Sequence, residues 1–231
     1  PSRIRGGHTY VEVRAAPEDV TSRGDGYNFL LSLGDSFARS PDEQAMYDNE
    51  EVKPLSENLD DLREGGVIVY DEALIDVDEI EGFEDRVEEN NWHVYPMDLR
   101  GIAREYGRNV MRNTAGVGVT AALLDIDLEA IEELMEEAMG GEVLEQNEAI
   151  LREAHDRAKA EFEFSHDLQV PEGNHDEEQV FLSGSAATAY GALDAGCRFI
   201  SGYPMTPWTD VYTIMTKHLP EMGGVAEQVE D

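Results

Sequence analysis

The sequence predicts an α/β protein built on open, mostly parallel β-sheets. Short, nearly all-apolar segments of strand length, such as the Val-Ile-Val-Tyr run at residues 67–70, alternate with longer segments of helical periodicity. A strand that is apolar on both faces is typical of a parallel sheet covered by helices on each side. Glycine pairs and proline-containing turns separate the segments, and this regular alternation of strands and helices favours the α/β class.

The first part of the chain, residues 1–164, is predicted to form one open-sheet domain. Gly65-Gly66 is interpreted as the end of a helix, because glycine often terminates helices. One later helix is rich in glycine and alanine, so close packing against its neighbours is expected. Strands are expected at residues 10–13, 27–33, 67–70 and 92–95, and helices at residues 55–63, 99–106, 114–124, 128–139 and 142–164.

Residues 165–178 are predicted to be a linker, because they contain proline, glycine and asparagine and show little apolar periodicity. Its two histidines, His166 and His175, are expected to be solvated. After the linker the alternation restarts, which predicts a second domain over residues 179–231. Its strands are expected at residues 179–182, 197–201 and from 225 onward, with helices at 185–195 and from the turn at 202–207 to about Leu219.

The charge balance indicates the environment of the chain and excludes some partners. The 231 residues include 51 acidic and 17 basic ones, a formal net charge of −34, and this argues against nucleic acid as a ligand. Three lysines stand against 14 arginines, and the acids are spread along the whole length. Such a uniform excess favours a high-salt cytoplasm, with an unusually acidic mesophilic protein as the alternative. No apolar run approaches the roughly 20 residues of a membrane span, so no membrane association is expected, and both chain ends look like those of a fragment.

The cysteine and histidine content predicts no metal site in this chain. Cys197 is the single cysteine, so an internal disulfide or a cysteine-ligated cluster is excluded, and a buried core thiol is the expected role. The six histidines show no spacing typical of metal ligands.

The segment Gly202–Asp210 contains the most informative candidate site. It follows a predicted parallel strand, and open α/β sheets bind ligands at the carboxyl ends of their strands. Thr206 is expected to cap the next helix, with Pro207 in its first turn. Two interpretations stay open from the residues alone: a rigid turn that presents a hydroxyl to a ligand, or simply a well-made helix start.

The same segment, together with the helix and strand before it, closely resembles the α-subunit of the 2-oxoacid:ferredoxin oxidoreductases. That family carries a Tyr-Pro-Ile-Thr-Pro-Ser-Ser-type motif, followed later by Gly-Gly, a strand and Gln-x-Glu-Asp-Glu. This sequence departs from the pattern in Met205, in the Trp208-Thr209 pair that replaces the two serines, and in Ser185, which replaces an asparagine. The matching residues, in the same order, are Tyr203-Pro204-Met205-Thr206-Pro207, Gly223-Gly224, Gln228 and Glu230-Asp231.

The first part resembles the γ-type domain that many of these enzymes fuse in front of the α-type domain. Residues 1–7 look like the family's Pro-x-x-Arg-Gly-Gly loop, and the resemblance covers nearly the whole chain. It implies a γ-type open-sheet α/β domain at residues 1–164, the linker at 165–178, and at 179–231 the start of the Rossmann-like domain that binds the pyrimidine ring in thiamine-diphosphate enzymes.

The resemblance implies thiamine-diphosphate-dependent oxidative decarboxylation of a 2-oxoacid, such as pyruvate or 2-oxoglutarate, to an acyl-coenzyme A, with electrons passed to ferredoxin. Thr206 would bind the substrate carboxylate, and Tyr203, Pro204 and Pro207 would lie in the cofactor pocket. Glu230 is a further candidate there, next to the position just beyond Asp231 at which the resemblance places the thiamine-contacting glutamate. The loop Arg5-Gly6-Gly7 could bind an anionic group such as a coenzyme A phosphate, or could be a tight turn with a surface arginine.

The resemblance also implies a hetero-oligomer. A partner β-subunit would bind Mg²⁺ and a [4Fe–4S] cluster, and this chain alone is expected to be inactive. Two alternatives remain: a subunit of an indolepyruvate-type oxidoreductase, or a non-catalytic assembly subunit that keeps the fold.

Overall fold

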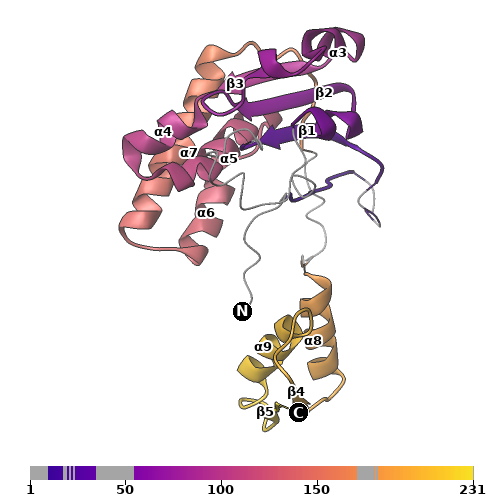
Figure 1. Cartoon of the computed structure of the whole chain (residues 1–231). Coiled ribbons are helices and arrows are strands. Elements are labelled where there is room, and N and C mark those ends of the chain that lie inside the picture. The colour runs from indigo at the N-terminus through magenta and orange to yellow at the C-terminus, as the bar shows by residue number, and fades with distance from the viewer. Residues whose placement is uncertain are drawn as a thin grey trace. The chain divides into compact units, whose positions relative to one another are not determined.

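The computed structural model describes residues 10–17, 20, 22, 24–34, 55–170, 180 and 182–230. The chain divides into two compact units, residues 1–173 and residues 174–231, which we call the first and the second unit (Figure 1). Both units contain parallel strands connected through helices, which confirms the predicted α/β class.

The first unit is built on a three-stranded parallel sheet with the order β1-β2-β3. The strands are β1 (Tyr27–Ser32), β2 (Leu62–Asp71) and β3 (His93–Met97). The central strand β2 is buried on both faces over its last part, as its apolar run predicts. Val67 and Val69 point into one hydrophobic cluster and Ile68 and Tyr70 into another, so helices cover the sheet on each side.

The two clusters contain different helices. On the side of Ile68 the strand packs against α2 (Leu55–Asn58) and α3 (Phe83–Glu89). On the side of Val67 it packs against α4 (Leu99–Tyr106), α5 (Arg112–Leu124) and α7 (Glu142–Glu161). The remaining elements of this unit are α6 (Leu128–Ala138) and the short 3₁₀ turns η3 (Leu59–Asp61), η4 (Val77–Glu79) and η5 (Asn109–Met111).

Helix α4 illustrates how local signals and burial agree. The side chain of Asp98 caps the helix by accepting a hydrogen bond from the backbone N–H of Gly101 at 2.6 Å. Leu99, Ile102 and Ala103 are its buried residues, at the i, i+3, i+4 spacing of a helix that buries one face. The predicted bounds of this helix are therefore confirmed at both ends.

Helices α5 and α7 pack closely because glycine replaces larger side chains at their contact. A Cβ atom on Gly118 would collide with the backbone oxygen of Leu151 and lie 3.0 Å from the Cβ of Ala154. Near the contact, the buried amide of Asn147 accepts a hydrogen bond from the hydroxyl of Thr114 at 2.6 Å. The expected close packing of the small-residue helix is confirmed.

Two predicted elements of the first unit are wrong. Residues 10–13 form no strand. The helix expected at residues 55–63 consists of α2 and η3, and the chain enters β2 at Leu62. Gly65-Gly66 therefore lies inside a strand, where Gly65 has φ +70 and the pairing of β1 with β2 shifts register. The glycines accommodate a strand irregularity rather than a helix end.

The start of the predicted linker packs against the first unit. His166 is half-buried, and its Nε2 atom has no solvent exposure, so the prediction that this histidine is solvated is wrong. His175 lies outside the described residues.

The second unit contains two parallel strands, β4 (Phe199–Gly202) and β5 (Val225–Gln228), with α8 (Gly184–Asp194) and α9 (Thr209–His218). Its small core contains Ala189, Leu193, Met215 and Leu219, and Ile200 packs against it. Cys197 also packs there but is half-buried rather than fully buried. Of the strand expected at residues 179–182, the two described residues, Val180 and Leu182, lie outside any strand.

No helix among the described residues is long and apolar enough to cross a membrane.

Candidate functional site

The candidate site lies where the two strands of the second unit end. Gly202 of β4 pairs with Gln228 of β5 in a parallel register, and the backbone N–H of Val229 donates to the Gly202 oxygen at 3.2 Å. The chain therefore leaves both strands at the same edge of the sheet. The turn Tyr203–Pro207 follows one strand end and Glu230 follows the other, which places them at the edge where open α/β sheets bind ligands.

Trp208 holds the turn in place. Its indole N–H donates to the backbone oxygen of Tyr203, which also accepts a hydrogen bond from the backbone N–H of Met205 at 2.9 Å. The indole ring lies directly against Gly202, where a Cβ atom would overlap it, and contacts the ring of Tyr212 at a centroid distance of 5.1 Å. The residue that departs most from the family motif is therefore the one that orders this turn.

The predicted helix start at Thr206-Pro207 is wrong by two residues. Helix α9 begins at Thr209 with Trp208 as its N-terminal flanking residue, and the backbone N–H of Tyr212 donates to the Trp208 oxygen at 3.1 Å. Thr206 and Pro207, which are joined by a cis peptide bond, belong to the preceding turn. Thr206 is consequently no helix cap, and its hydroxyl has no hydrogen-bond partner among the described residues.

The turn presents its side chains to solvent. Tyr203 is 53% exposed and Met205 64%, and Pro204, Thr206 and Pro207 are also exposed. An unbonded hydroxyl between exposed apolar side chains can donate to an anionic group while its neighbours contact an apolar ring. Glu230 is exposed as well, on the chain after β5. The loop Arg5-Gly6-Gly7 lies outside the described residues.

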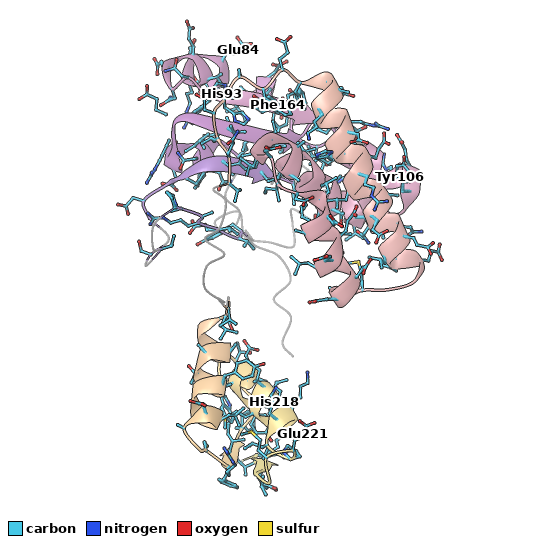
Figure 2. All side chains as sticks on the ribbon, turned by 180° about the vertical axis from the view of Figure 1, so that it is seen from behind. Glu84, His93, Tyr106, Phe164, His218 and Glu221 are labelled. Atoms are coloured by element: carbon cyan, nitrogen blue, oxygen red, sulfur yellow. The ribbon has the colours of Figure 1, made fainter. Side chains whose placement is uncertain are left out.

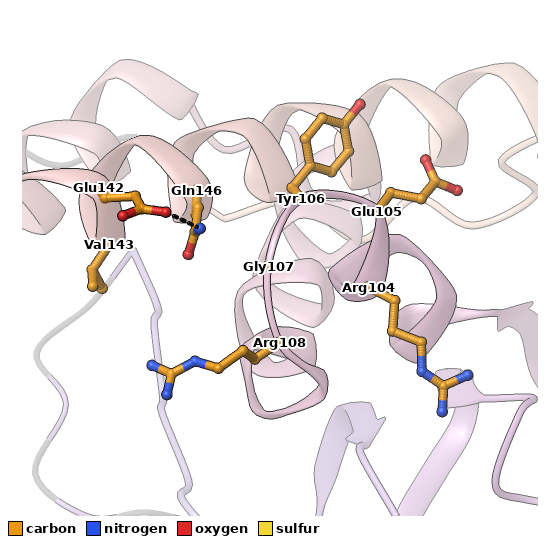
Figure 3. Close-up of a pocket in the computed structure, with 8 residues that line it drawn as sticks. All are labelled: Arg104, Glu105, Tyr106, Gly107, Arg108, Glu142, Val143 and Gln146. Atoms are coloured by element: carbon orange, nitrogen blue, oxygen red, sulfur yellow. Dashed lines mark hydrogen bonds between the residues drawn. The ribbon is translucent and has the colours of Figure 1, made fainter.

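A hollow of about 500 Å³ lies in the first unit, between the end of α4 and the start of α7 (Figure 3). Its side chains are mostly charged and largely bonded: Arg104 donates to Asn109 at 2.6 Å and Gln146 donates to Glu142 at 3.1 Å. Figure 3 shows the guanidinium groups of Arg104 and Arg108 pointing away from each other. The arrangement differs from the mostly apolar lining of typical ligand pockets, and no predicted site residue borders it.

One buried carboxyl group, that of Asp71, was not identified as a candidate from the sequence. Asp71 at the end of β2 has no exposed surface; its Oδ1 accepts from the backbone N–H of Ala73 at 3.3 Å, and its Oδ2 has no partner among the described residues. Burial raises the pKa of Asp71, whereas the backbone N–H groups of Ala73 and Arg100 oppose the shift; the charge of Asp98 raises the pKa further and that of Arg100 lowers it. The signal in the sequence was a carboxylate directly after the apolar run at residues 67–70.

Within the described ranges, no group of three or more histidine, cysteine, aspartate or glutamate side chains could hold a metal ion. The described part of the chain therefore contains no candidate metal centre.

Comparisons with known proteins agree with this architecture. A family model described as pyruvate ferredoxin/flavodoxin oxidoreductase matches residues 1–157. The chain belongs to this oxidoreductase family. The resemblance drawn from the motifs is thereby confirmed.

Curated relatives are subunits of related enzymes. A 2-oxoglutarate synthase subunit KorA from Methanocaldococcus jannaschii is 49% identical over 51 residues, which are 22% of this chain and 14% of that protein. A 2-oxoacid:ferredoxin oxidoreductase subunit alpha from Sulfolobus sp is 21% identical over 238 residues, covering 94% of this chain and 36% of that protein. The chain thus spans only a minor part of the length of the relatives it matches.

One solved structure has the same fold over most of the chain. It is a 2-oxoglutarate:ferredoxin oxidoreductase from Magnetococcus marinus with 2-oxoglutarate, coenzyme A and succinyl-CoA bound. The TM-score is 0.71 at 24% sequence identity, and the match covers 93% of this chain and 34% of that chain.

Proposed function

We propose that this chain is part of the α chain of a 2-oxoacid:ferredoxin oxidoreductase, and that the turn Tyr203–Pro207 forms part of its 2-oxoacid site. The observation that carries the proposal is the exposed hydroxyl of Thr206 at the carboxyl edge of β4 and β5, which no other described residue hydrogen-bonds. Membership of the family supports the general chemistry, the oxidation of a 2-oxoacid with electrons passed to ferredoxin.

In this proposal Thr206 donates a hydrogen bond to the carboxylate of the 2-oxoacid. A hydrogen bond to a charged group contributes about 1.5–3 kcal/mol, roughly twice a neutral one. The indole of Trp208 holds the backbone of the turn, so the hydroxyl needs little ordering when the substrate binds.

Thiamine diphosphate, when bound, supplies the chemistry by which the 2-oxoacid loses CO₂. The residues of this edge fit such a group, because the exposed side chains of Tyr203, Pro204 and Pro207 offer apolar surface to an aromatic ring. Glu230, also exposed, offers a carboxylate at the neighbouring strand end. These residues would orient the cofactor and exclude water around it.

We assign the metal groups of the reaction, Mg²⁺ and a [4Fe–4S] cluster, to a partner β-subunit, as the family resemblance implies. The 231 residues contain one cysteine, too few for a cysteine-ligated cluster. The described residues contain no group of three or more histidine, cysteine, aspartate or glutamate side chains that could hold a metal ion. Coenzyme A would accept the acyl group and ferredoxin the electrons. The loop Arg5-Gly6-Gly7 remains our candidate for the coenzyme A phosphates, on the strength of its residue types alone.

The test is the steady-state kinetics of the full-length complex with Thr206→Ala, using 2-oxoglutarate and pyruvate with coenzyme A and ferredoxin. We expect kcat/KM to fall about 10- to 100-fold, which corresponds to the loss of one charge-assisted hydrogen bond. Thr206→Ser, which keeps the hydroxyl, should retain most of the activity. The wild-type comparison also identifies the preferred 2-oxoacid.

Thr213→Ala is the matched control, because Thr213 lies on α9 of the same unit and donates only to the backbone oxygen of Thr209, at 2.8 Å. Its kinetics should equal those of the wild type. Thr206→Ala kinetics equal to those of the control, with the complex assembled, would remove Thr206 from the site and favour the alternative of a non-catalytic assembly subunit. An aryl 2-oxoacid is assayed as a third substrate. If the wild-type complex turns over this substrate but neither 2-oxoglutarate nor pyruvate, the indolepyruvate-type alternative is favoured.

We also propose that the chain works in a high-salt cytoplasm, since its net charge of −34 is spread over the whole sequence. Screening by about 1 M salt shortens the range of this repulsion to about 3 Å. The melting temperature should rise steeply between about 0.1 and 2 M KCl, whereas a flat dependence would contradict the salt adaptation.

A further inference from the structure

The segment that follows α7 crosses β3, the edge strand of the first unit, and we call residues 162–168 the clasp. Three rings of the clasp surround Tyr95 of β3: Phe162 at a centroid distance of 5.2 Å, His166 at 5.7 Å and Phe164 at 6.3 Å. The hydroxyl of Tyr95 accepts a hydrogen bond from the backbone N–H of Ser165 at 3.2 Å. Figure 2 labels Phe164 of the clasp and His93 of β3.

The hydrogen bond that His166 accepts defines its protonation state. Its Nδ1 accepts a hydrogen bond from the backbone N–H of Leu168 at 3.2 Å, so this nitrogen carries no proton. The remaining proton then lies on Nε2, which is buried and has no partner among the described residues. The docked clasp therefore requires a neutral imidazole, because a proton on Nδ1 would remove the acceptor for Leu168.

The surroundings of His166 also disfavour a positive charge. Its ring is half-buried beside Phe164, at a centroid distance of 6.2 Å, and the imidazole of His93 lies 5.8 Å away. Burial lowers the pKa of His166, and His93 lowers it further, whereas the neighbouring Asp167 raises it. His93 itself is bonded through Nδ1 to the hydroxyl of Ser165 at 2.6 Å, so the strand β3 also holds the clasp through a hydrogen bond next to His166.

We propose that the clasp is a pH-sensitive attachment, which holds the start of the connection between the two units on β3 while His166 is neutral and releases it when His166 is protonated. Release would let the connection begin near the end of α7 at Glu161, which lengthens the tether between the two units. This inference does not depend on the proposed function of the second unit.

The direction of the pH dependence follows from the lowered pKa. A free imidazole titrates at about 6.5, and the docked one at a lower pH. Docking is therefore fully favoured above about pH 6.5 and weakens as the pH falls below that value, until the docked pKa is reached. In this window the opening equilibrium should increase roughly tenfold per pH unit, since one proton is taken up on release.

The test is amide hydrogen exchange of the full-length chain in its complex, followed by mass spectrometry between pH 5 and 8 at constant salt. Rates are corrected for the intrinsic pH dependence of exchange. The amides of Ser165 and Leu168, which donate to Tyr95 and His166, should be protected at pH 8 and lose protection below about pH 6.5. Absence of protection at pH 8, or protection that does not change with pH, would overturn the proposal.

The variant His166→Asn separates the titration from the contacts. Asparagine places a carbonyl oxygen near the position of Nδ1 and can still accept from Leu168, but it does not titrate. Its clasp should show no pH dependence beyond the intrinsic one. His155→Asn, on α7 and bonded to Asp156 instead of the clasp, is the matched control and should behave as the wild type. A wild-type pH response in His166→Asn would assign the effect to another group and overturn the proposal.

A second measurement needs no variant. Slow exchange of the imidazole C2 hydrogen, read by mass spectrometry over days, reports the pKa of each histidine in the assembled protein. The pKa of His166 should lie below the free value of about 6.5. A value at or above 6.5 would contradict a clasp that depends on the neutral ring.

Discussion

The two units bury their sheets to different extents. In the first unit the central strand β2 is covered on both faces, and Val67, Ile68 and Val69 are fully buried. In the second unit Ile200 of β4 packs against the core, but Phe199 and Val225, which pair with each other across the two strands, remain 61% and 56% exposed. The first unit therefore completes its own core, whereas the second has one sheet face covered and one open. Measuring how single substitutions change the free energy of unfolding of each unit tests this difference.

The largest expected effect is the loss of a core side chain in the first unit. Ile68→Ala should lower the free energy of unfolding of that unit by about 2–5 kcal/mol, because the Ile68 side chain is fully buried on the face of the sheet that α2 and α3 cover. Phe199→Ala in the second unit should cost about 0.5 kcal/mol or less.

The two tryptophans allow each unit to be followed separately in urea, since Trp92 lies in the first unit and Trp208 in the second. Trp208→Phe and Trp92→Phe supply the two backgrounds in which Ile68→Ala and Phe199→Ala are read. A cost at Phe199 as large as that at Ile68 would mean that the second unit also packs its outer sheet face in the isolated chain.

Replacing two helical glycines by alanine should change the free energy of unfolding by intermediate amounts, with opposite signs in the two units. Gly118→Ala on α5 forces a methyl group against the Leu151 oxygen and should cost about 1–3 kcal/mol. Gly191→Ala on α8 meets no atom within 4 Å and should stabilise the second unit by about 0.5–1 kcal/mol through helix propensity. Urea titration of the same pair of units measures both. Destabilisation by Gly191→Ala would indicate that α8 is covered more closely than the structure shows.

The smallest effect concerns the buried carboxyl of Asp71. Because its pKa is raised in the folded state, the folded protein binds this proton more tightly, and stability from this group falls as the pH rises above the unfolded value of about 3.9. Asp71→Asn, measured by urea unfolding, should therefore gain stability relative to the wild type as the pH rises from about 4 toward 7. A difference that is constant over this range would contradict the raised pKa.

Elements with strong local signals were predictable from the sequence. Helix α4 combines a capping aspartate, Asp98, with apolar residues at helical spacing, and its bounds agree at both ends. The apolar run of β2 likewise predicted burial on both faces. Such signals are local, and the surrounding structure agrees with them.

The errors arose where a distant partner decides the conformation. Gly65-Gly66 has the local pattern of a helix end, yet the pairing with β1 places it in a strand. The start of α9 is set by Trp208, which reaches back to Tyr203 and Gly202 instead of leaving Thr206 as the cap. His166 was predicted to be solvated because no local sequence pattern indicates that the segment after α7 packs on Tyr95. The candidate site itself came from a family motif rather than from residue physics.

The most direct test of the central claim is a structure of the full complex with its 2-oxoacid bound. The claim predicts a distance of about 2.5–3.0 Å between the Thr206 hydroxyl oxygen and a carboxylate oxygen of the substrate, as expected for an O–H···O⁻ hydrogen bond. The Tyr203–Pro207 turn should keep the hydrogen bond from Trp208 to Tyr203. A substrate carboxylate bound elsewhere, with the Thr206 hydroxyl facing solvent, would contradict the assignment.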